Sequence, residues 1–487
     1  MAKLYFITGS QDLYGEETLK QVAKDSAVVA AHLNEKLGDV VNVEWKPTVR
    51  NSNEIISVCR EASMDEDCVG VITWMHTFSP AKMWIKGLQI LTKPLLHLHT
   101  QANEKLPYGT IDMDFMNLNQ SAHGDREYGF IASRLDVPRE VVVGYYADPD
   151  VISQIRRFGE VAKALAFSKS LKVAMFGSNM REVAVTDGDR VESQICFGWE
   201  VNYYGIGDLV ELVNQVTDAE VDAKIAEYKS AYTMTTDHMA PIREQAKYEI
   251  ALDRFMVEGG FGAYTDTFQD LHNLKQLPGL ATQRMMAKGY GFGAEGDYKT
   301  SALGAVMFEM AKHRKGSTGF MEDYTYDFVD GLVLGAHMLE VSPEFAAGKP
   351  TVEVHDLGIG GKEAPARLVF DGVQGDAVAV CMTDMGDRFR LVAAEIELVK
   401  QPKPMPNLPV ARIMWKLKPD FKTGAAAWLY AGGGHHTVVS TALSMKDIRM
   451  FAKLTRTELV EITEKTDIEA LQAELDMKNV LAKLRKF

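Results

Sequence analysis

The sequence has only four cysteines, Cys59, Cys68, Cys196 and Cys381, and no two of them have the spacing of a metal-binding pair. We therefore expect free thiols in packed positions, as in cytoplasmic proteins. Basic runs are also absent, and the formal net charge is −14. Because binding to a polyanion requires a basic face, this charge argues against nucleic acid or an anionic membrane as a partner.

Long apolar runs are absent as well, since no segment approaches the roughly 20 residues needed to cross a bilayer. The start, MAKLYFITGSQ, lacks a charged region followed by a long apolar core and a small-residue cleavage site. We therefore expect no export signal and a cytoplasmic location. P-loop and G-x-S-x-G motifs are missing, and no cysteine lies in an electropositive or glycine-rich turn, which argues against a cysteine nucleophile.

What the sequence does contain is typical of a soluble globular protein, with 46% hydrophobic and 25% charged residues. Its 487 residues are too many for one core and favour two to four domains. Short apolar segments at 3–8, 40–45, 68–74, 94–99 and 141–145 alternate with helical segments. This alternation predicts a parallel sheet covered by helices on both faces. Loops 9–15 and 75–80 would follow strand ends, where such sheets bind ligands.

A second alternating unit begins at residues 171–176 after a polar boundary at 168–170, and it includes a long helical region from about 218 to 257. After Gly316 the hydrophobic period becomes two, in segments such as TVEVHDLGI, ARLVF, DAVAVCMTDM and FRLVAAEIELV. This change predicts a barrel or a sandwich. A helix at 446–454, a strand near 458–462 and a helix from about 468 close the chain. The expected domains are 1–170, 171–315 and 316–487.

The chemistry is expected to centre on residues 289–340, which contain Glu295, Glu322 and His337. These residue types hold divalent metals and move protons. The apolar spacing of residues 301–313 predicts a helix, which places Glu295 at or just before its start, where free backbone N–H groups favour a carboxylate. Residues 320–328 predict a strand, on which Glu322 and Asp323 face opposite sides. The G-x-G-x-x-G match at 291–296 is rejected because a helical segment, not a strand, precedes it.

The pair His435 and His436, within AGGGHHT, could complete a metal site for Mn²⁺ or a similar ion. If that segment is extended, only one of the two can point inward. The ligand spacing is long and irregular, however, and a histidine placed like His337 in an apolar strand is more often a core histidine. Several loop residues are singly typical of surface or capping positions: Gln11, Tyr14, His76, His123, Arg181 and Lys299. Three aromatics are equally typical of a core: Phe78, Phe268 and Phe292.

Together these motifs resemble those of L-arabinose isomerases over essentially the whole chain. Ten blocks carry the resemblance in order: GSQDLYGEETL, WMHTFSPAKMWI, DMDFMNLNQSAHGDRE, NMREVAVTDGD, DLHNLKQLPGL, EGDYKT, FMEDYTY, LGAHMLEV, LGIGGK and AGGGHHT. The resemblance implies two Rossmann-like α/β domains with parallel sheets and a C-terminal β-barrel-like domain, similar to fucose isomerases. It also implies trimers that pair into homohexamers, with active sites at subunit interfaces.

The implied reaction converts L-arabinose to L-ribulose and, in many members, D-galactose to D-tagatose. Implied Mn²⁺ ligands are Glu295, Glu322, His337 and His436, with Co²⁺ as an alternative ion. Glu295 and Glu322 would be the acid/base pair. Implied substrate contacts are Gln11, Leu13, Tyr14, Phe78, Met180, Thr265, Phe268 and, from a neighbouring subunit, His123. Because the C2 hydrogen of an aldose is barely acidic, we expect a metal-stabilised cis-enediol while the two carboxylates move protons.

The sequence departs from the family pattern at Ser178, where many members carry Asp, and at Gly434, where Ala is usual. The short loop at 328–332 could alter the substrate preference. Two alternatives stay open. One is a fucose-type isomerase of the same fold, and the other is a non-catalytic sugar-binding protein.

Overall fold

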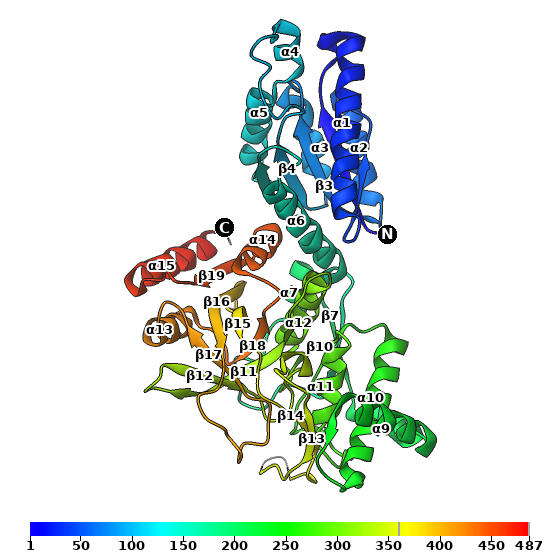
Figure 1. The fold of residues 1–487 in the computed structure, drawn as a ribbon, viewed down its shortest axis with the longest axis vertical. Helices are drawn as coiled ribbons and strands as arrows, with labels where there is room; N and C mark the ends of the chain where they lie inside the picture. Colours follow the sequence, from blue (N-terminus) through cyan, green and yellow to red (C-terminus); the bar gives the residue numbers. More distant parts are fainter. Residues whose placement is uncertain (359–360, 486–487) are drawn as a thin grey trace. The chain divides into compact units, whose positions relative to one another are not determined.

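The computed structural model describes residues 1–358 and 361–485 (Figure 1). It contains two compact units. The first comprises Met1–Ala166 together with Lys453–Arg456, and the second comprises Phe167–Ala452 and the chain from Thr457 onward. Helices α6 (Pro149–Ser168) and α14 (Met445–Thr455) contain residues of both units.

The first unit is built on a parallel five-stranded sheet of order β2-β1-β3-β4-β5, as the alternation predicts. Its strands are β1 (Lys3–Gly9), β2 (Asn42–Trp45), β3 (Cys68–Met75), β4 (Leu95–His99) and β5 (Arg139–Val143). Its other helical segments are η1 (Asp12–Tyr14), α1 (Gly15–Leu37), α2 (Ser52–Met64), η2 (Ala81–Trp84), α3 (Ile85–Ile90), α4 (Met113–Leu118) and α5 (Ser121–Arg134). Every residue of β3 is buried, as expected for a strand covered on both faces.

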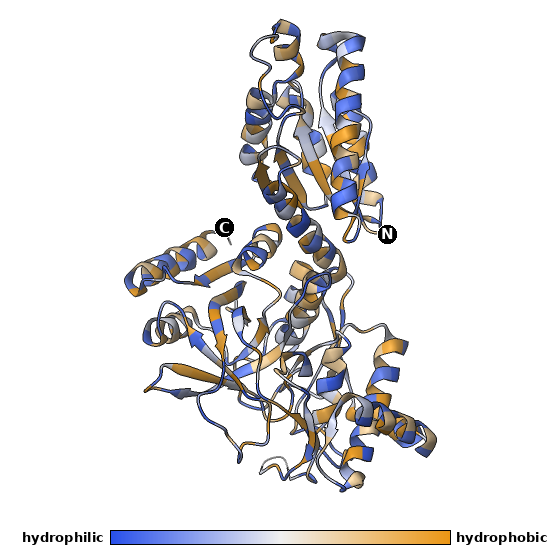
Figure 2. Ribbon diagram, in the orientation of Figure 1, coloured by the Kyte–Doolittle hydropathy of each residue, from blue (hydrophilic) through white to orange (hydrophobic). Residues whose placement is uncertain are grey.

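Local sequence explains where these helices begin and which face they bury. Asn51 caps α2 by accepting the backbone N–H groups of Asn53 and Glu54, and Asp112 caps α4 by accepting that of Phe115. In α1 the hydrophobic residues gather on part of the helix while the others are hydrophilic (Figure 2). This pattern buries one face of α1 and leaves the other in solvent.

The second unit contains a parallel four-stranded sheet of order β10-β9-β6-β7. Its strands are β6 (Lys172–Phe176), β7 (Glu200–Tyr204), β9 (Ala263–Asp266) and β10 (Gly291–Gly293). The helices of this part are α7 (Arg190–Phe197), α8 (Ile206–Gln215), α9 (Asp218–Ala231), α10 (Met239–Gly259), α11 (Gly279–Ala287) and α12 (Tyr298–Ala311). Helix α12 contacts β6, β9 and β10 of this sheet as well as three barrel strands, so its first ten residues are buried all round rather than along one stripe.

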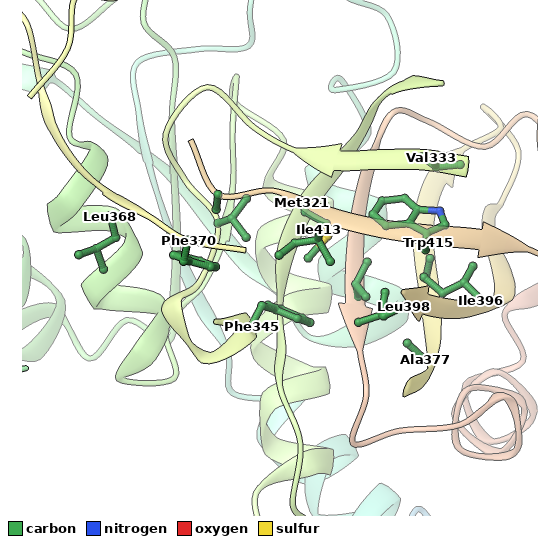
Figure 3. Packing of buried hydrophobic residues seen from close by; sticks show 14 of the residues in the cluster. Met321, Val333, Phe345, Leu368, Phe370, Ala377, Ile396, Leu398, Ile413 and Trp415 are labelled. Atoms are coloured by element: carbon green, nitrogen blue, oxygen red, sulfur yellow. The ribbon is translucent and has the colours of Figure 1, made fainter. Parts of the chain in front are cut away.

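The rest of the second unit is a closed antiparallel barrel in which six strands follow the order β15-β18-β11-β12-β17-β16 and return to β15. Its strands are β11 (Thr318–Asp327), β12 (Leu332–Ala336), β15 (Gly375–Asp384), β16 (Phe389–Val399), β17 (Ile413–Leu417) and β18 (His436–Ser440). Strand β19 (Glu458–Ile462) joins β16 in parallel from outside the ring. The barrel interior holds Met321, Val333, Ile396, Ile413 and Trp415 (Figure 3). The remaining helical segments here are η3 (Pro343–Phe345), α13 (Phe421–Ala431) and α15 (Ile468–Arg485).

Three details differ from the sequence-based expectation. The helical region from 218 to 257 is divided into α9 and α10 by a short strand, β8 (Thr233–Met234). Strand β8 pairs with β13 (Thr351–Val354), which pairs in turn with β14 (Ala366–Val369), so these strands form a separate sheet rather than part of the barrel. Also, Cys196 is exposed, whereas the other three cysteines are buried. Among the described residues, no helix is both long enough and apolar enough to cross a membrane.

Candidate metal centre

Strand register brings three of the four predicted metal ligands together. Glu322 is the one residue of β11 that pairs on both sides, opposite His436 on β18 and opposite Ala336 on β12. His337 follows Ala336 directly, just beyond the end of β12. Because residues opposite each other on neighbouring strands lie about 5 Å apart, this row places Glu322 between the two histidines.

The fourth predicted ligand, Glu295, comes from the loop between β10 and α12. It adopts the left-handed backbone conformation, with φ of 63°, which is uncommon for a residue other than glycine. The surrounding loop holds it there, since the backbone N–H of Met180 donates to the Glu295 carbonyl oxygen at 2.9 Å. Gly296 is required next, because a Cβ at this position would lie 2.5 Å from the Cα of Asn179. The strained backbone directs the carboxylate of Glu295 toward the histidines.

Both histidines are fixed through Nδ1 and leave Nε2 available. His337 donates from Nδ1 to Glu340 Oε2 at 2.6 Å, and His436 Nδ1 lies 3.2 Å from Asp297 Oδ2. Their Nε2 atoms face the two predicted carboxylate ligands. His337 Nε2 lies 3.9 Å from Glu322 Oε2, and His436 Nε2 lies 3.8 Å from Glu295 Oε2.

This arrangement suits a divalent cation. His436 Nε2 is buried and has no hydrogen-bond partner within the part of the chain that the structure describes, which is costly unless a ligand satisfies it. A carboxylate on Nδ1 fixes the tautomer that presents the Nε2 lone pair, as metal-binding histidines require. Two imidazoles and two carboxylates are a donor set for Mn²⁺ or a similar ion. The residues present therefore fit the metal that the resemblance implies.

An aromatic ring holds both histidines from one side. Phe320, two residues before Glu322 on β11, packs edge to face against His337 at 5.0 Å and against His436 at 5.1 Å between ring centroids. The ring restricts rotation of both imidazoles and keeps water from their apolar edges. Phe320 was not among the residues predicted from the sequence. Its place in the alternation of β11, on the same face as Glu322, was the signal that could have found it.

The two carboxyl groups differ in their electrostatic environment. A hydrogen bond from His435 lowers the pKa of Glu295, against the opposing effect of its burial. Burial raises the pKa of Glu322, although His337 and His435 oppose that rise. Burial also lowers the pKa of His436, which keeps its imidazole neutral. The site therefore holds carboxyl groups of unlike acidity beside a neutral imidazole.

Asp297 is buried and connects His436 of the cluster to several other polar groups. Besides facing His436, its carboxylate accepts the N–H and hydroxyl of Thr300 and lies 3.2 Å from Lys299 Nζ. Burial opposes ionisation of Asp297, but Lys299 and His436 outweigh it and lower its pKa. Lys299 is fully buried and also donates to the carbonyl oxygens of Thr186 and Asp187. The expectation that Lys299 lies at the surface or at a cap is therefore wrong.

Only one of the paired histidines was expected to point inward if their segment is extended, and His435 lies outside the extended strand. Its Nε2 lies 3.8 Å from Glu295 Oε2, the same distance as that of His436. With Glu295 these two histidines place ligand atoms within 4.8 Å of one another. Both can approach Glu295 because β18 begins only at His436, so His435 is not held in the strand's alternation.

The predicted substrate contacts of the second unit lie in different settings. Phe268 lines a small cavity together with Glu295 and His337. Thr265 is fully buried, and its hydroxyl donates to the Gly293 carbonyl oxygen at 2.6 Å. Met180 is tied to the loop of Glu295 by the backbone hydrogen bond described above. The same cavity includes Asp266, which was not predicted from the sequence; burial and Glu340 raise its pKa to about 7.

In the first unit, three of the five predicted substrate contacts are linked to one another, and a fourth bonds a residue near them. Gln11 donates from Nε2 to the Phe78 carbonyl oxygen at 3.0 Å, and the rings of Phe78 and His123 stack at 5.2 Å. Tyr14 donates its hydroxyl to Gln120, three residues before His123, at 2.9 Å. The remaining residue, Leu13, is 82% exposed.

Comparison with known proteins decides the family. Sequence models of the L-arabinose isomerase N-terminal, central and C-terminal domains match residues 1–170, 172–313 and 317–458. The chain belongs to the L-arabinose isomerase family. It is therefore an isomerase. Within the family-like block LGIGGK, residues 359–360 lie outside those that the structure describes.

Individual relatives match over nearly their whole length. The L-arabinose isomerase of Geobacillus stearothermophilus is 52% identical over 486 residues, covering 98% of each chain. That of Bacillus subtilis (strain 168) is 50% identical over 492 residues, covering 99% of each. Among solved structures, a glucose-galactose binding protein from Geobacillus stearothermophilus covers 63% of this chain and 90% of its own at 12% identity, but its TM-score of 0.16 carries no argument.

Proposed function

We propose that the protein interconverts L-arabinose and L-ribulose, and D-galactose and D-tagatose, with a Mn²⁺ ion held by Glu295, Glu322, His337 and His436. The observation that supports this most is the pair of imidazole Nε2 atoms aimed at two carboxylates, each imidazole fixed through Nδ1 by a further carboxylate. The names of relatives about half identical over the full chain support the choice of sugar.

Isomerisation moves one hydrogen from C2 to C1 of the sugar and one proton from the C2 hydroxyl to the C1 oxygen. When bound, the metal would stabilise negative charge on these two oxygens as a Lewis acid. Glu295 and Glu322 reach the cluster from two different elements, so they can act on different atoms of one substrate. In the proposed mechanism one carboxylate takes the C2 proton, which gives a cis-enediol, and returns it to C1. The other transfers the proton between the oxygens, each transfer contributing about 10²- to 10⁴-fold in rate.

Product analysis tests the reaction. With Mn²⁺ present, L-arabinose and D-galactose should each yield the corresponding ketose, and L-fucose should turn over far more slowly. In D₂O the product should carry deuterium at C1, because a proton held on a carboxylate exchanges with solvent. Complete retention of the substrate hydrogen would instead indicate a hydride shift, and turnover of L-fucose alone would indicate a fucose-type isomerase.

Metal binding can be measured without turnover. Mn²⁺ titrated into metal-free protein by calorimetry should bind once per chain. The variant Glu340→Gln keeps the size of the Nδ1 partner of His337 but removes its charge, and changes of this kind typically weaken metal affinity by about 10- to 100-fold. As a matched control, Glu353→Gln alters a carboxylate that bonds Nε2 of His355 away from the cluster, and it should leave affinity unchanged. Equal affinity in both variants would contradict the proposed ligand set.

We also propose that active sites are shared between subunits of a homohexamer in the cytoplasm, with domains 1–170, 171–315 and 316–487. His123 is exposed within the first unit, and the metal cluster lies in the second. If sites are shared, mixing inactive His123→Ala and Glu322→Ala chains should restore part of the activity, because some sites would then receive both intact residues. Failure of rescue in mixed oligomers would contradict the sharing.

A further inference from the structure

The barrel contains a cavity of about 390 Å³, lined on β11 by Asp323 rather than Glu322 and on β18 by Thr437 rather than His436. His435, which also faces Glu295, forms part of the lining. The interior of a small barrel is normally filled by side chains. Here small residues leave it open; they are Ala379, Ala394, Ala425, Gly433 and Gly434. Pockets of this volume are of the size that holds a small organic ligand. We call it the barrel cavity.

Two tryptophans form fixed walls of the barrel cavity. Trp428 on α13 donates from Nε1 to the Gly434 carbonyl oxygen at 3.0 Å, and its ring occupies the space beside Gly433, where a Cβ would lie 2.4 Å from Nε1. Trp415 on β17 lies near Val333 and Ile396 (Figure 3). Its ring covers Gly335, where a Cβ would lie 1.7 Å from a ring carbon. Both rings are therefore pre-positioned to receive a ligand without losing side-chain freedom.

The polar lining includes residues that alternate with the metal ligands. Asp323 follows Glu322 on β11, and Thr437 follows His436 on β18, so both point to the barrel side of their strands. The Thr437 hydroxyl is already committed to the Met321 carbonyl oxygen. The Asp323 carboxylate accepts a hydrogen bond from the Tyr326 hydroxyl at 3.0 Å. Nowhere in residues 1–358 and 361–485 does a lysine or arginine form an ion pair with it.

The barrel cavity has a route to solvent. Leu429 on α13 and Tyr326 on β11 both line it, and they are 77% and 40% exposed. An occupant can therefore enter between α13 and the end of β11 without unfolding the barrel. The walls are mainly apolar, and the carboxylate lies among them, which favours an apolar body that carries one cationic or donor group.

We propose that the barrel cavity binds a small organic cation, a primary ammonium on an apolar body of about one ring, with the ammonium beside Asp323 and the body between Trp415 and Trp428. An ammonium supplies a cationic hydrogen-bond donor to Asp323, whose carboxylate no lysine or arginine of the described residues pairs with, and tryptophan faces attract cations as well as apolar groups. Neither the metal nor the sugar reaction is required for this binding, so the proposal stands independently of the proposed function.

Titration with 2-phenylethylamine tests the proposal on the full-length, Mn²⁺-loaded protein. Tryptophan fluorescence and calorimetry should both report saturable binding of one amine per chain. The neutral analogue 2-phenylethanol should bind at least about tenfold more weakly, and Asp323→Asn should weaken amine binding by a similar factor, about 1.4 kcal/mol. The filling variant Ala425→Phe, or Ala379→Leu if the first is poorly folded, should abolish binding.

A matched control lies one residue away on the same strand. Glu322→Gln changes a carboxylate that faces the metal cluster, so it should leave amine affinity unchanged if the amine occupies the barrel cavity. Loss of binding in Glu322→Gln but not in Asp323→Asn would place the amine at the metal cluster and overturn the proposal. Equal affinity for the amine and the alcohol would overturn the cationic assignment, and absence of saturable binding would overturn the site.

Discussion

Replacing Lys299 with methionine should destabilise the second unit far more than an ordinary lysine substitution. The ammonium group is fully buried on α12 and has three partners, the carbonyl oxygens of Thr186 and Asp187 at 2.9 and 2.7 Å and Asp297 Oδ1 at 3.2 Å. Methionine fills similar space but leaves the Asp297 carboxylate buried without its cation. Removing one member of a buried ion pair costs about 3–5 kcal/mol.

The control is Lys312→Met at the C-terminal end of the same helix. The Lys312 side chain is 61% exposed and pairs with Glu309, an interaction worth less than about 1 kcal/mol. Urea unfolding followed by tryptophan fluorescence should give nearly the same midpoint for Lys312→Met and the native protein, and a clearly lower one for Lys299→Met. Limited trypsin digestion should also cut faster after Arg181 in Lys299→Met, because Lys299 anchors the loop that contains this residue.

Two results would refute this reasoning. If Lys299→Met unfolds within about 1 kcal/mol of Lys312→Met, the buried pair does not carry the assigned energy. The second test is the double variant Lys299→Met, Asp297→Asn, which removes both charges. It should cost less than the sum of the single changes, by about 0.5–3 kcal/mol, because neither charge is then left unpaired. Strict additivity would show that the two residues act independently.

Two further predictions concern other parts of the fold. A hydrogen bond with Asp125 raises the pKa of His99. This contact should therefore stabilise the first unit fully below about pH 6.5 and lose its effect as the pH rises through the higher folded-state pKa. In thermal melts His99→Gln should destabilise the protein more at about pH 5.5 than at about pH 8.5, and a pH-independent difference would contradict this prediction. Gly335→Ala would place a Cβ 1.7 Å from the Trp415 ring and should lower the free energy of unfolding in urea by about 1–3 kcal/mol. At Gly348 a Cβ would meet no atom within 4 Å, so Gly348→Ala should change that free energy by no more than about 0.5 kcal/mol. Similar losses for both variants would disprove the clash.

Local patterns predicted most elements because the forces that shape them act over a few residues. The strand expected near 458–462 is β19 (Glu458–Ile462), and the opposite facing of Glu322 and Asp323 follows from alternation alone. Non-local pairing could not be predicted in this way. Strand β8 exists because Thr233 and Met234 find partners in β13, more than a hundred residues later. A two-residue strand has no periodicity to detect, so it was absorbed into a helical region.

In the candidate site too, local features could be predicted from the sequence and contacts between distant segments could not. Its carboxylates and His337 could be singled out by residue type, glycine neighbours and the family motifs. The burial of Lys299 could not, because its partners Thr186 and Asp187 lie on a loop more than a hundred residues earlier. Whether His435 faces Glu295 depends on where β18 begins. The ends of strands are the boundaries that a sequence predicts least reliably.

In the barrel, Glu322 pairs with His436 on one side and Ala336 on the other. This row makes β11 intolerant of insertions, whereas the turn after β11 tolerates them. One residue added to β11 ahead of Met321 would turn the Glu322 side chain toward the two tryptophans and present Met321 to the histidines instead. A residue added in the turn between β11 and β12, where Phe328 and Val329 are exposed, shifts nothing that the strands hold in line. Length variation among relatives should therefore collect in that turn and be nearly absent from the five residues that pair β11 with β18.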